Sequence, residues 1–161
     1  PPRYQEISAD VSPTIEEKGV WARVIAGECL GVSSSIDTVI PITLIHVKMQ
    51  EGSELIQKLD SNLNSMIYVF SGNVAIPRGT GVKTHPQAFG LGVKQQISDG
   101  ELGILSEGDS IVIKSNVFSE FLILAGPELN EPIARYGPFV MNTREEIQQA
   151  FVDYQNGTFA N

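Results

Sequence analysis

Positions 137–151 read Gly-Pro-Phe-Val-Met-Asn-Thr-Arg-Glu-Glu-Ile-Gln-Gln-Ala-Phe, and this stretch says more about the fold than any other part of the chain. A Gly-Pro turn opens it. Thr143 suits an N-cap, and Glu146 three residues later completes a capping box. Apolar residues then recur at helical spacing: Ile147, Ala150, Phe151 and Tyr154. Gly157 allows a left-handed stop, so the pattern predicts a short amphipathic helix over 143–155.

The sequence before this helix is typical of β-strands. In residues 20–25 apolar Val, Ala and Val alternate with Trp, Arg and Ile, which is the period of a strand with one buried face. Further short β-rich runs follow, and Gly-containing turn pairs separate them: 38–49, 67–70, 74–76, 102–105, 111–113 and 118–125. Many short strands and one terminal helix indicate an all-β sandwich or barrel. Residues 1–19 are expected to be a lead-in segment, and residues 78–100 a long loop or ragged hairpin.

Length and charge restrict the function classes. The chain has 161 residues, which suits a single domain over 1–161. Its formal net charge is −8, from 11 basic and 19 acidic residues. A nucleic-acid surface needs clustered Lys and Arg, so no direct nucleic-acid partner is expected. No apolar run approaches the ~20 residues that span a bilayer, so no membrane partner is expected. The chain begins Pro-Pro without Met, which suggests a piece of a longer protein.

The only cysteine is Cys29, so an internal disulfide is impossible. A single cysteine favours a reducing compartment, and a cytoplasmic location is expected. The neighbouring Glu28 carboxylate should raise the pKa of the thiol, which argues against a nucleophilic role.

Several strings together resemble the pirin family. They are residues 3–7 (Arg-Tyr-Gln-Glu-Ile), 24–28 with Gly31, Thr38 with Pro41, 68–72, 107–110, 122–131 and the stretch 137–151. The resemblance covers nearly the whole chain, apart from about 78–100. Pirins contain two cupin domains, and this chain resembles the C-terminal one. The resemblance implies a cupin double-stranded β-helix, also called a jelly-roll barrel, with a short C-terminal α-helix. It also adds the nucleus as a location if the source is eukaryotic.

The residues that would hold a cupin metal are missing from the expected positions. Cupins bind a metal through His, His, Glu and His. The resemblance implies that the N-terminal domain of pirins has such a set of ligands. Counting back from Tyr68 places Lys58 and Asp60 at the first two positions, with Asn64 where a Glu often stands. An ammonium group does not ligate a metal at neutral pH. The second cupin motif, which follows Gly108-Asp109, should bring another His to the metal. This chain has Ser119, Glu120 and Phe121 there instead. We therefore predict no catalytic residues, no metal and no cofactor in this chain, with iron only in an N-terminal half.

Two functions from different classes remain open. The first is a non-catalytic cupin module that packs on an iron-binding N-terminal half, self-associates, or contacts regulatory proteins, as the transcription-cofactor role linked to pirins implies. The alternative is a cupin oxygenase, similar to quercetin 2,3-dioxygenase. That activity would reside in an intact two-domain pirin or at an atypical site here, around Asp60, His46 and His85. We favour the module, because catalytic metal sites need three well-placed protein ligands.

Two groups of residues are candidates for binding. Three apolar residues stand between the Gly-Pro turn and the helix cap: Phe139, Val140 and Met141. They are either core beneath the helix or an interface patch that a second half would cover. A metal-free barrel also has a mouth that could hold a small aromatic or acidic molecule. The candidate residues for that pocket are Trp21, Lys58 and Tyr68.

Overall fold

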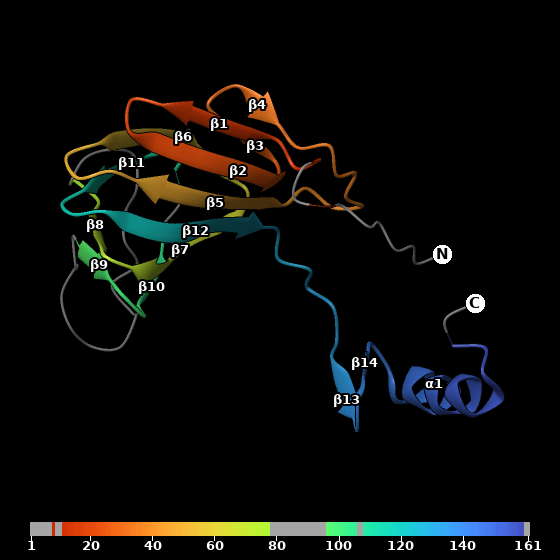
Figure 1. Ribbon diagram of the computed structural model, residues 1–161. Coiled ribbons are helices and arrows are strands. Elements are labelled where there is room, and N and C mark those ends of the chain that lie inside the picture. The colour runs from red at the N-terminus through yellow and green to blue at the C-terminus, as the bar shows by residue number, and fades with distance from the viewer. Residues whose placement is uncertain (1–7, 9–10, 78–95, 106–107, 160–161) are drawn as a thin grey trace. The chain divides into compact units, whose positions relative to one another are not determined.

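The computed structural model describes residues 8, 11–77, 96–105 and 108–159 (Figure 1). The chain divides into two compact units, Pro1–Glu128 and Leu129–Asn161. The length of the chain predicts a single domain, and within it the structure distinguishes these two compact units. Within the described ranges, no helix has the length and apolar character needed to cross a membrane.

Two antiparallel sheets and a small hairpin make up the first unit (Figure 1). The larger sheet has six strands in the order β1 (Thr14–Glu17), β2 (Val20–Ala26), β5 (Thr43–Met49), β12 (Ser119–Gly126), β7 (Asn64–Ser71) and β10 (Leu102–Ile104). The smaller sheet has four: β6 (Glu54–Lys58), β11 (Ser110–Ser115), β8 (Asn73–Ala75) and β9 (Gln96–Ser98). β3 (Glu28–Cys29) pairs with β4 (Val32–Ser33).

Alternation along each strand places one set of side chains between the two sheets. In β2 every second residue is buried, beginning with Val20, as the sequence pattern predicted. The same holds for β12, which alternates over its whole length. The resulting core contains aliphatic side chains and one phenylalanine, and many of them are fully buried. Each such side chain contributes about 1.5–3 kcal/mol by leaving water, so this core holds the barrel closed.

Two boundaries differ from the sequence analysis. β1 lies inside the segment expected to be a lead-in, and it pairs with β2 along its full length. β9 lies at the end of the stretch expected to be a loop, and it pairs with β8. Both strands are short and mostly exposed, so they carry little of the apolar alternation by which strands are found. The remainder of the expected loop, residues 78–95, lies outside the described residues.

A hairpin and the predicted helix form the second unit. β13 (Ala134–Tyr136) pairs with β14 (Phe139–Met141), and α1 spans Arg144–Asn156. The capping box forms as predicted, since Thr143 Oγ1 accepts from the Glu146 N–H and the Glu146 carboxylate accepts from the Thr143 N–H. Gly157 ends the helix with a left-handed φ of 71°. Three buried side chains form a separate small core: Phe139, Ile147 and Ala150.

Candidate functional site

The barrel interior of the first unit holds apolar side chains and one amide at the positions where a cupin metal would need ligands. On β6 the inward positions are Leu55 and Gln57, at 1% and 3% exposure. Lys58, the residue found by counting back from the turn, is exposed on the opposite face. In the described part of the chain no three His, Cys, Asp or Glu side chains come close enough to hold a metal ion.

At the second cupin motif, the side chains that face the barrel interior are the hydroxyl of Ser119 and the ring of Phe121. Ser119 and Phe121 are fully buried, and Glu120 between them faces outward. The Ser119 Oγ donates to the Asn73 carbonyl at 2.8 Å and accepts from the Asn73 N–H at 3.1 Å. The hydroxyl is therefore committed to closing the turn before β8. These residues do not fit a transition metal, which requires imidazole, carboxylate or thiolate donors.

Of the alternative metal site, the two described residues, His46 and Asp60, do not meet in the barrel. His46 lies on β5 between the buried Ile45 and Val47, so its ring faces away from the barrel interior. Asp60 is exposed after β6, where its carboxylate accepts from the Asn62 backbone N–H at 2.9 Å. His85 lies outside the described residues.

The outer face of the six-stranded sheet carries a cluster that the sequence analysis did not assemble. We call it the sheet-face cluster: Trp21, Arg23, His46, Lys48, Phe70 and Glu120. The His46 ring stands edge-on to Trp21 with centroids 5.4 Å apart, and lies 5.7 Å from the Phe70 ring. His46 Nε2 is 2.7 Å from Glu120 Oε1, and Lys48 Nζ is 3.3 Å from the same oxygen.

Two cations also lie over the single tryptophan. The Arg23 guanidinium carbon is 5.5 Å from the Trp21 ring centroid, and Lys48 Nζ is 5.4 Å from it. Such contacts stabilise by ~0.5–1 kcal/mol at exposed sites. Arg23 Nε is buried and has no hydrogen-bond acceptor. The cluster is an aromatic and charged surface with one imidazole–carboxylate contact, between His46 and Glu120, and none of its six members is a hydroxyl or thiol nucleophile.

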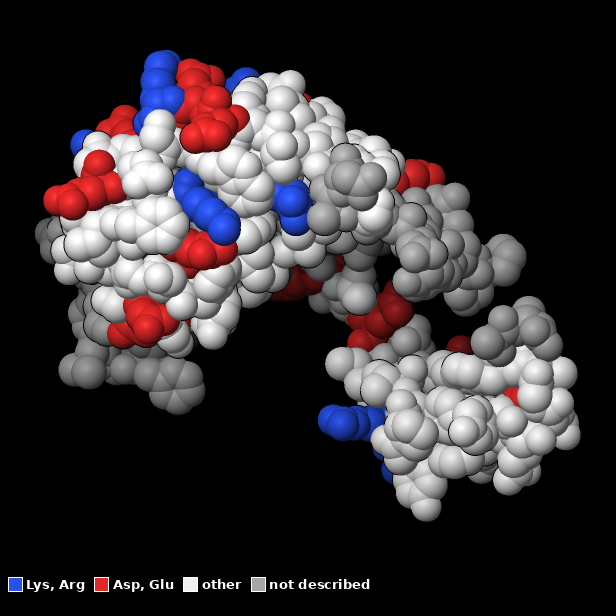
Figure 2. Space-filling model, in the orientation of Figure 1, with Lys and Arg blue, Asp and Glu red and all other residues white. Residues whose placement is uncertain are grey.

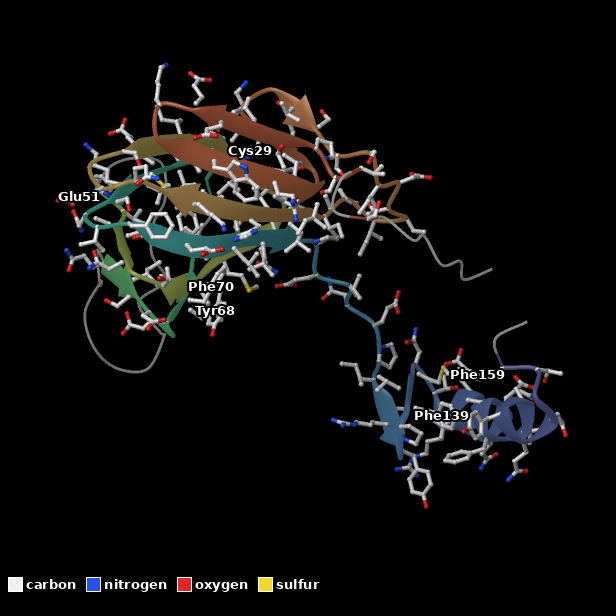
Figure 3. The ribbon with its side chains drawn as sticks, in the orientation of Figure 1. Cys29, Glu51, Tyr68, Phe70, Phe139 and Phe159 are labelled. Atoms are coloured by element: carbon white, nitrogen blue, oxygen red, sulfur yellow. The ribbon has the colours of Figure 1, made fainter. Side chains whose placement is uncertain are left out.

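The structure brings together two of the three candidate pocket residues. Trp21 and Tyr68 both lie on the outer face of the six-stranded sheet, linked through His46 and Phe70. The Phe70 ring is 6.3 Å from that of Tyr68, and the two rings lie side by side in Figure 3. Lys58 ends β6 in the other sheet and is not brought to them. The pockets identified among the described residues have other linings, so a pocket bounded by all three is not supported.

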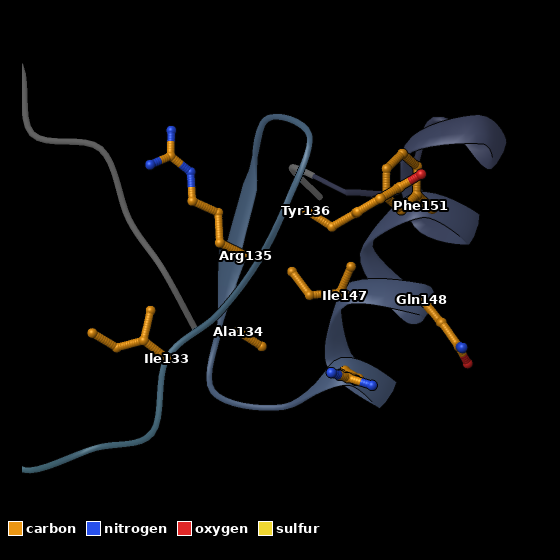
Figure 4. Close-up of a pocket in the computed structure, with 8 residues that line it drawn as sticks. Ile133, Ala134, Arg135, Tyr136, Ile147, Gln148 and Phe151 are labelled. Carbon is orange, nitrogen blue, oxygen red and sulfur yellow. The ribbon is translucent and has the colours of Figure 1, made fainter.

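The largest of these pockets is a cavity of about 550 Å³ between the hairpin and α1 (Figure 4). Ile147 and Phe151 of α1 border it, opposite Tyr136 of the hairpin. Arg135 points away from the helix in Figure 4, and no carboxylate or imidazole lines the cavity. The ionisable side chains of its described lining are Tyr136 and two arginines.

The candidate interface residues separate into core and surface. Phe139 is 7% exposed and packs against three aromatic rings, those of Phe151, Tyr154 and Phe159, with centroids 4.8–6.0 Å away. Phe139 is thus core of the second unit. Met141 is half-buried against the same core, while Val140 is 58% exposed. The prediction of an interface on this stretch now depends on Val140 alone.

Burial makes Cys29 unreactive in the folded protein. The side chain is 1% exposed. Burial first, and the Glu28 carboxylate second, raise the pKa of the thiol from 9.0 to about 11, in the direction predicted from the sequence.

We expect the folded protein at pH 8 to react with a disulfide reagent at least about 100-fold more slowly than the urea-unfolded chain, because thiolate is the reacting species. Since the folded-state pKa is raised, the thiol's contribution to stability is complete below pH 9 and is lost as pH rises toward 11. Reagent kinetics with urea melts across that range would test both statements. Equal rates for folded and unfolded protein would contradict them.

The fold defines a cupin barrel, in which the described residues bring no metal-ligand set together. The chain belongs to the pirin family, because the Pirin C-terminal cupin domain matches residues 44–160. It is 35% identical over 157 residues to pirin from Homo sapiens, covering 96% of this chain and 50% of that one. It is 34% identical to a pirin-like protein from Solanum lycopersicum, again over half of that protein's length. The family and the cupin fold expected from the sequence are both confirmed.

Solved structures agree. Quercetin 2,3-dioxygenase from Acinetobacter baumannii superimposes with a TM-score of 0.78 and 30% identity, covering 99% of this chain and 51% of that one. GK1651 from Geobacillus kaustophilus superimposes with a TM-score of 0.68 at 20% identity, which supports the fold alone. The chain spans about half the length of these relatives.

Proposed function

We propose that this chain is a metal-free, non-catalytic cupin module of a pirin-like protein, which acts by packing against another cupin half. One observation carries the proposal: the inward positions of the barrel hold Leu55, Gln57 and Phe121, which offer one amide and no imidazole or carboxylate for iron. A catalytic metal needs three protein ligands with an open position. A barrel with this interior is suited to support and contact instead.

Exposed apolar side chains on the six-stranded sheet support the packing role. They lie on β7 and β10, with exposures of 39% for Tyr68, 38% for Phe70, 52% for Leu102 and 50% for Ile104. Neighbouring exposed apolar residues on one face commonly mark a partner site. Because the relatives are about twice as long as this chain, the proposed partner is the N-terminal half, which would carry the iron. Regulatory proteins would use exposed surface of the same module.

The similarity to a quercetin 2,3-dioxygenase favours a second candidate function for the two-domain protein. The region of that enzyme that matches this chain is 30% identical to it, covers 99% of this chain and makes up 51% of the enzyme's own chain. In this case the oxygenase chemistry would belong to the other half, and this module would position or cover it. The 161-residue chain by itself is then expected to be inactive toward quercetin.

Iron binding tests the proposal directly. After anaerobic dialysis of the 161-residue protein against Fe²⁺, we expect well below one iron per chain and an unchanged melting temperature, because ligand binding to the folded state alone would raise it. Metal analysis and thermal melts with and without chelator give both values.

One tightly held iron per chain would contradict the proposal. Asp60→Ala and His46→Ala would then show whether the atypical site is responsible, with Glu51→Ala at an exposed turn as the matched control. Loss of iron in the first two variants but not in the third would favour the enzyme alternative.

A further inference from the structure

Three side-chain ladders cross the outer face of the six-stranded sheet. The first runs through Glu16, Trp21, Lys48 and Glu120. The second runs through Thr14, Arg23, His46, Leu122, Tyr68 and Leu102. The third runs through Leu44, Leu124, Met66 and Ile104. The charged residues thus lie on β1, β2, β5 and the start of β12, and the apolar residues lie toward β7 and β10.

This face is electrically balanced although the whole chain is acidic. The ladders contain two carboxylates, Glu16 and Glu120, and two cations, Arg23 and Lys48, whereas the full chain has a net charge of −8. Figure 2 shows the surface over β2, β5 and β12 as mostly white, with a few groups of both signs. Two copies could meet here without local repulsion, and charges farther away than about 8 Å are screened at physiological salt.

One cation and one anion on the face have no ionic partner. Lys48 and Glu120 form an ion pair with each other. Arg23 has no ion pair among the described residues, and its Nε lacks an acceptor. Glu16, exposed beside Trp21 on the neighbouring strand, likewise has none within the same residues. A guanidinium that is buried further by a partner needs an acceptor, and a carboxylate can supply it bidentately.

The face has about the size of a dimer interface. Six strands spaced about 4.8 Å apart span about 24 Å, and strands of seven to eight residues run about 25 Å. The flat footprint is on the order of 600 Å², and side-chain relief increases the accessible area toward the ~800 Å² per partner of a standard complex.

We propose that this face binds a second copy of the chain, with Arg23 of each copy against Glu16 of the other. In a two-fold interface the same patch of each copy faces the other. The Arg23 of the first copy therefore pairs with the Glu16 of the second, and the Glu16 of the first pairs with the Arg23 of the second. Trp21 lies beside both residues and becomes covered. The inference rests on the proposed function in taking this face as a contact surface: the second copy occupies it when no N-terminal half does, so the two partners compete for the same face.

The test is a charge swap in the 161-residue chain. Sedimentation of the unaltered protein should show a concentration-dependent dimer at 0.15 M salt, with a blue shift of the emission of the single tryptophan. Arg23→Glu and Glu16→Arg should each weaken the dimer at least about tenfold, because each creates two like-charge contacts. An equimolar mixture of the two variants should dimerise again, since both cross contacts are then opposite in sign. The matched controls Lys58→Glu and Glu51→Arg, which lie off this face, should leave the dimer unchanged.

Three results would overturn the inference. The unaltered protein could remain monomeric up to about 1 mM, which corresponds to about −4 kcal/mol. The dimer could persist in both variants, which would place it on another surface. The mixture could fail to associate while each variant keeps the unaltered melting temperature, which would reject the Arg23–Glu16 contact. Iron binding is measured independently, so failure of this inference and failure of the proposed function are distinguishable.

Discussion

Replacing Phe121 with alanine is expected to lower the free energy of unfolding by about 3–5 kcal/mol. The ring is fully buried on β12, where Val47 and Val69 are its register partners on the adjacent strands. Removing the ring loses the free energy gained by transferring it from water to the core. It also leaves a cavity that the β-sheet framework cannot close. Urea unfolding followed by Trp21 fluorescence would measure the change.

The matched control is the same substitution on the outer face. Phe70 on β7 is 38% exposed, so Phe70→Ala should cost only about 1 kcal/mol by the area that it loses. A similarly small loss for Phe121→Ala would mean that the barrel interior already contains space. The tight packing of Phe121 inferred from its complete burial would then be wrong.

Gly72→Ala is expected to destabilise the protein by about 3 kcal/mol, from two separate causes. Gly72 has a φ of +78°, where an L-residue is strained. An added Cβ would also lie 2.3 Å from the Phe118 carbonyl oxygen and 2.6 Å from Ser119 Oγ. The Ser119 hydroxyl would have to move, and its hydrogen bonds with Asn73 would be lost.

Gly52→Ala separates the two causes. Gly52 has nearly the same φ, +75°, but an added Cβ meets nothing within 4 Å. It should therefore show only the backbone strain, about 1–2 kcal/mol. The same urea titration on both variants gives the difference, which is the contribution of the close approach at Gly72. Equal losses in the two proteins would show that the turn relaxes without disturbing Ser119.

The elements that could be predicted from the sequence are those whose signals are local. The helix was found because its cap, its apolar spacing and its terminating glycine lie within fifteen residues, and the observed α1 begins at Arg144 after Thr143 as expected. The long strands were found by alternation, as in β2. Strand β1 has no such signal, because its pattern holds one half-buried residue among four.

The sheet-face cluster depends on pairings between distant segments. His46 and Glu120 are 74 residues apart in the sequence and meet because β5 pairs with β12. Register between such strands follows from the packing of the whole sheet, so a single sequence does not reveal it. The same limit explains the pocket candidates, since Trp21 and Tyr68 share a face but Lys58 belongs to the other sheet.

The position of β12 has a consequence for how the protein is made. β12 is the last barrel strand in the sequence, yet it lies in the middle of the larger sheet, between β5 and β7. While the ribosome is still synthesising the chain, before residue 126 emerges, β5 and β7 each lack their shared neighbour and present an unpaired edge. Contacts between distant segments form slowly, and exposed edges of this kind attract other chains. Nascent chains of this domain should therefore need chaperone protection until β12 has emerged from the ribosome.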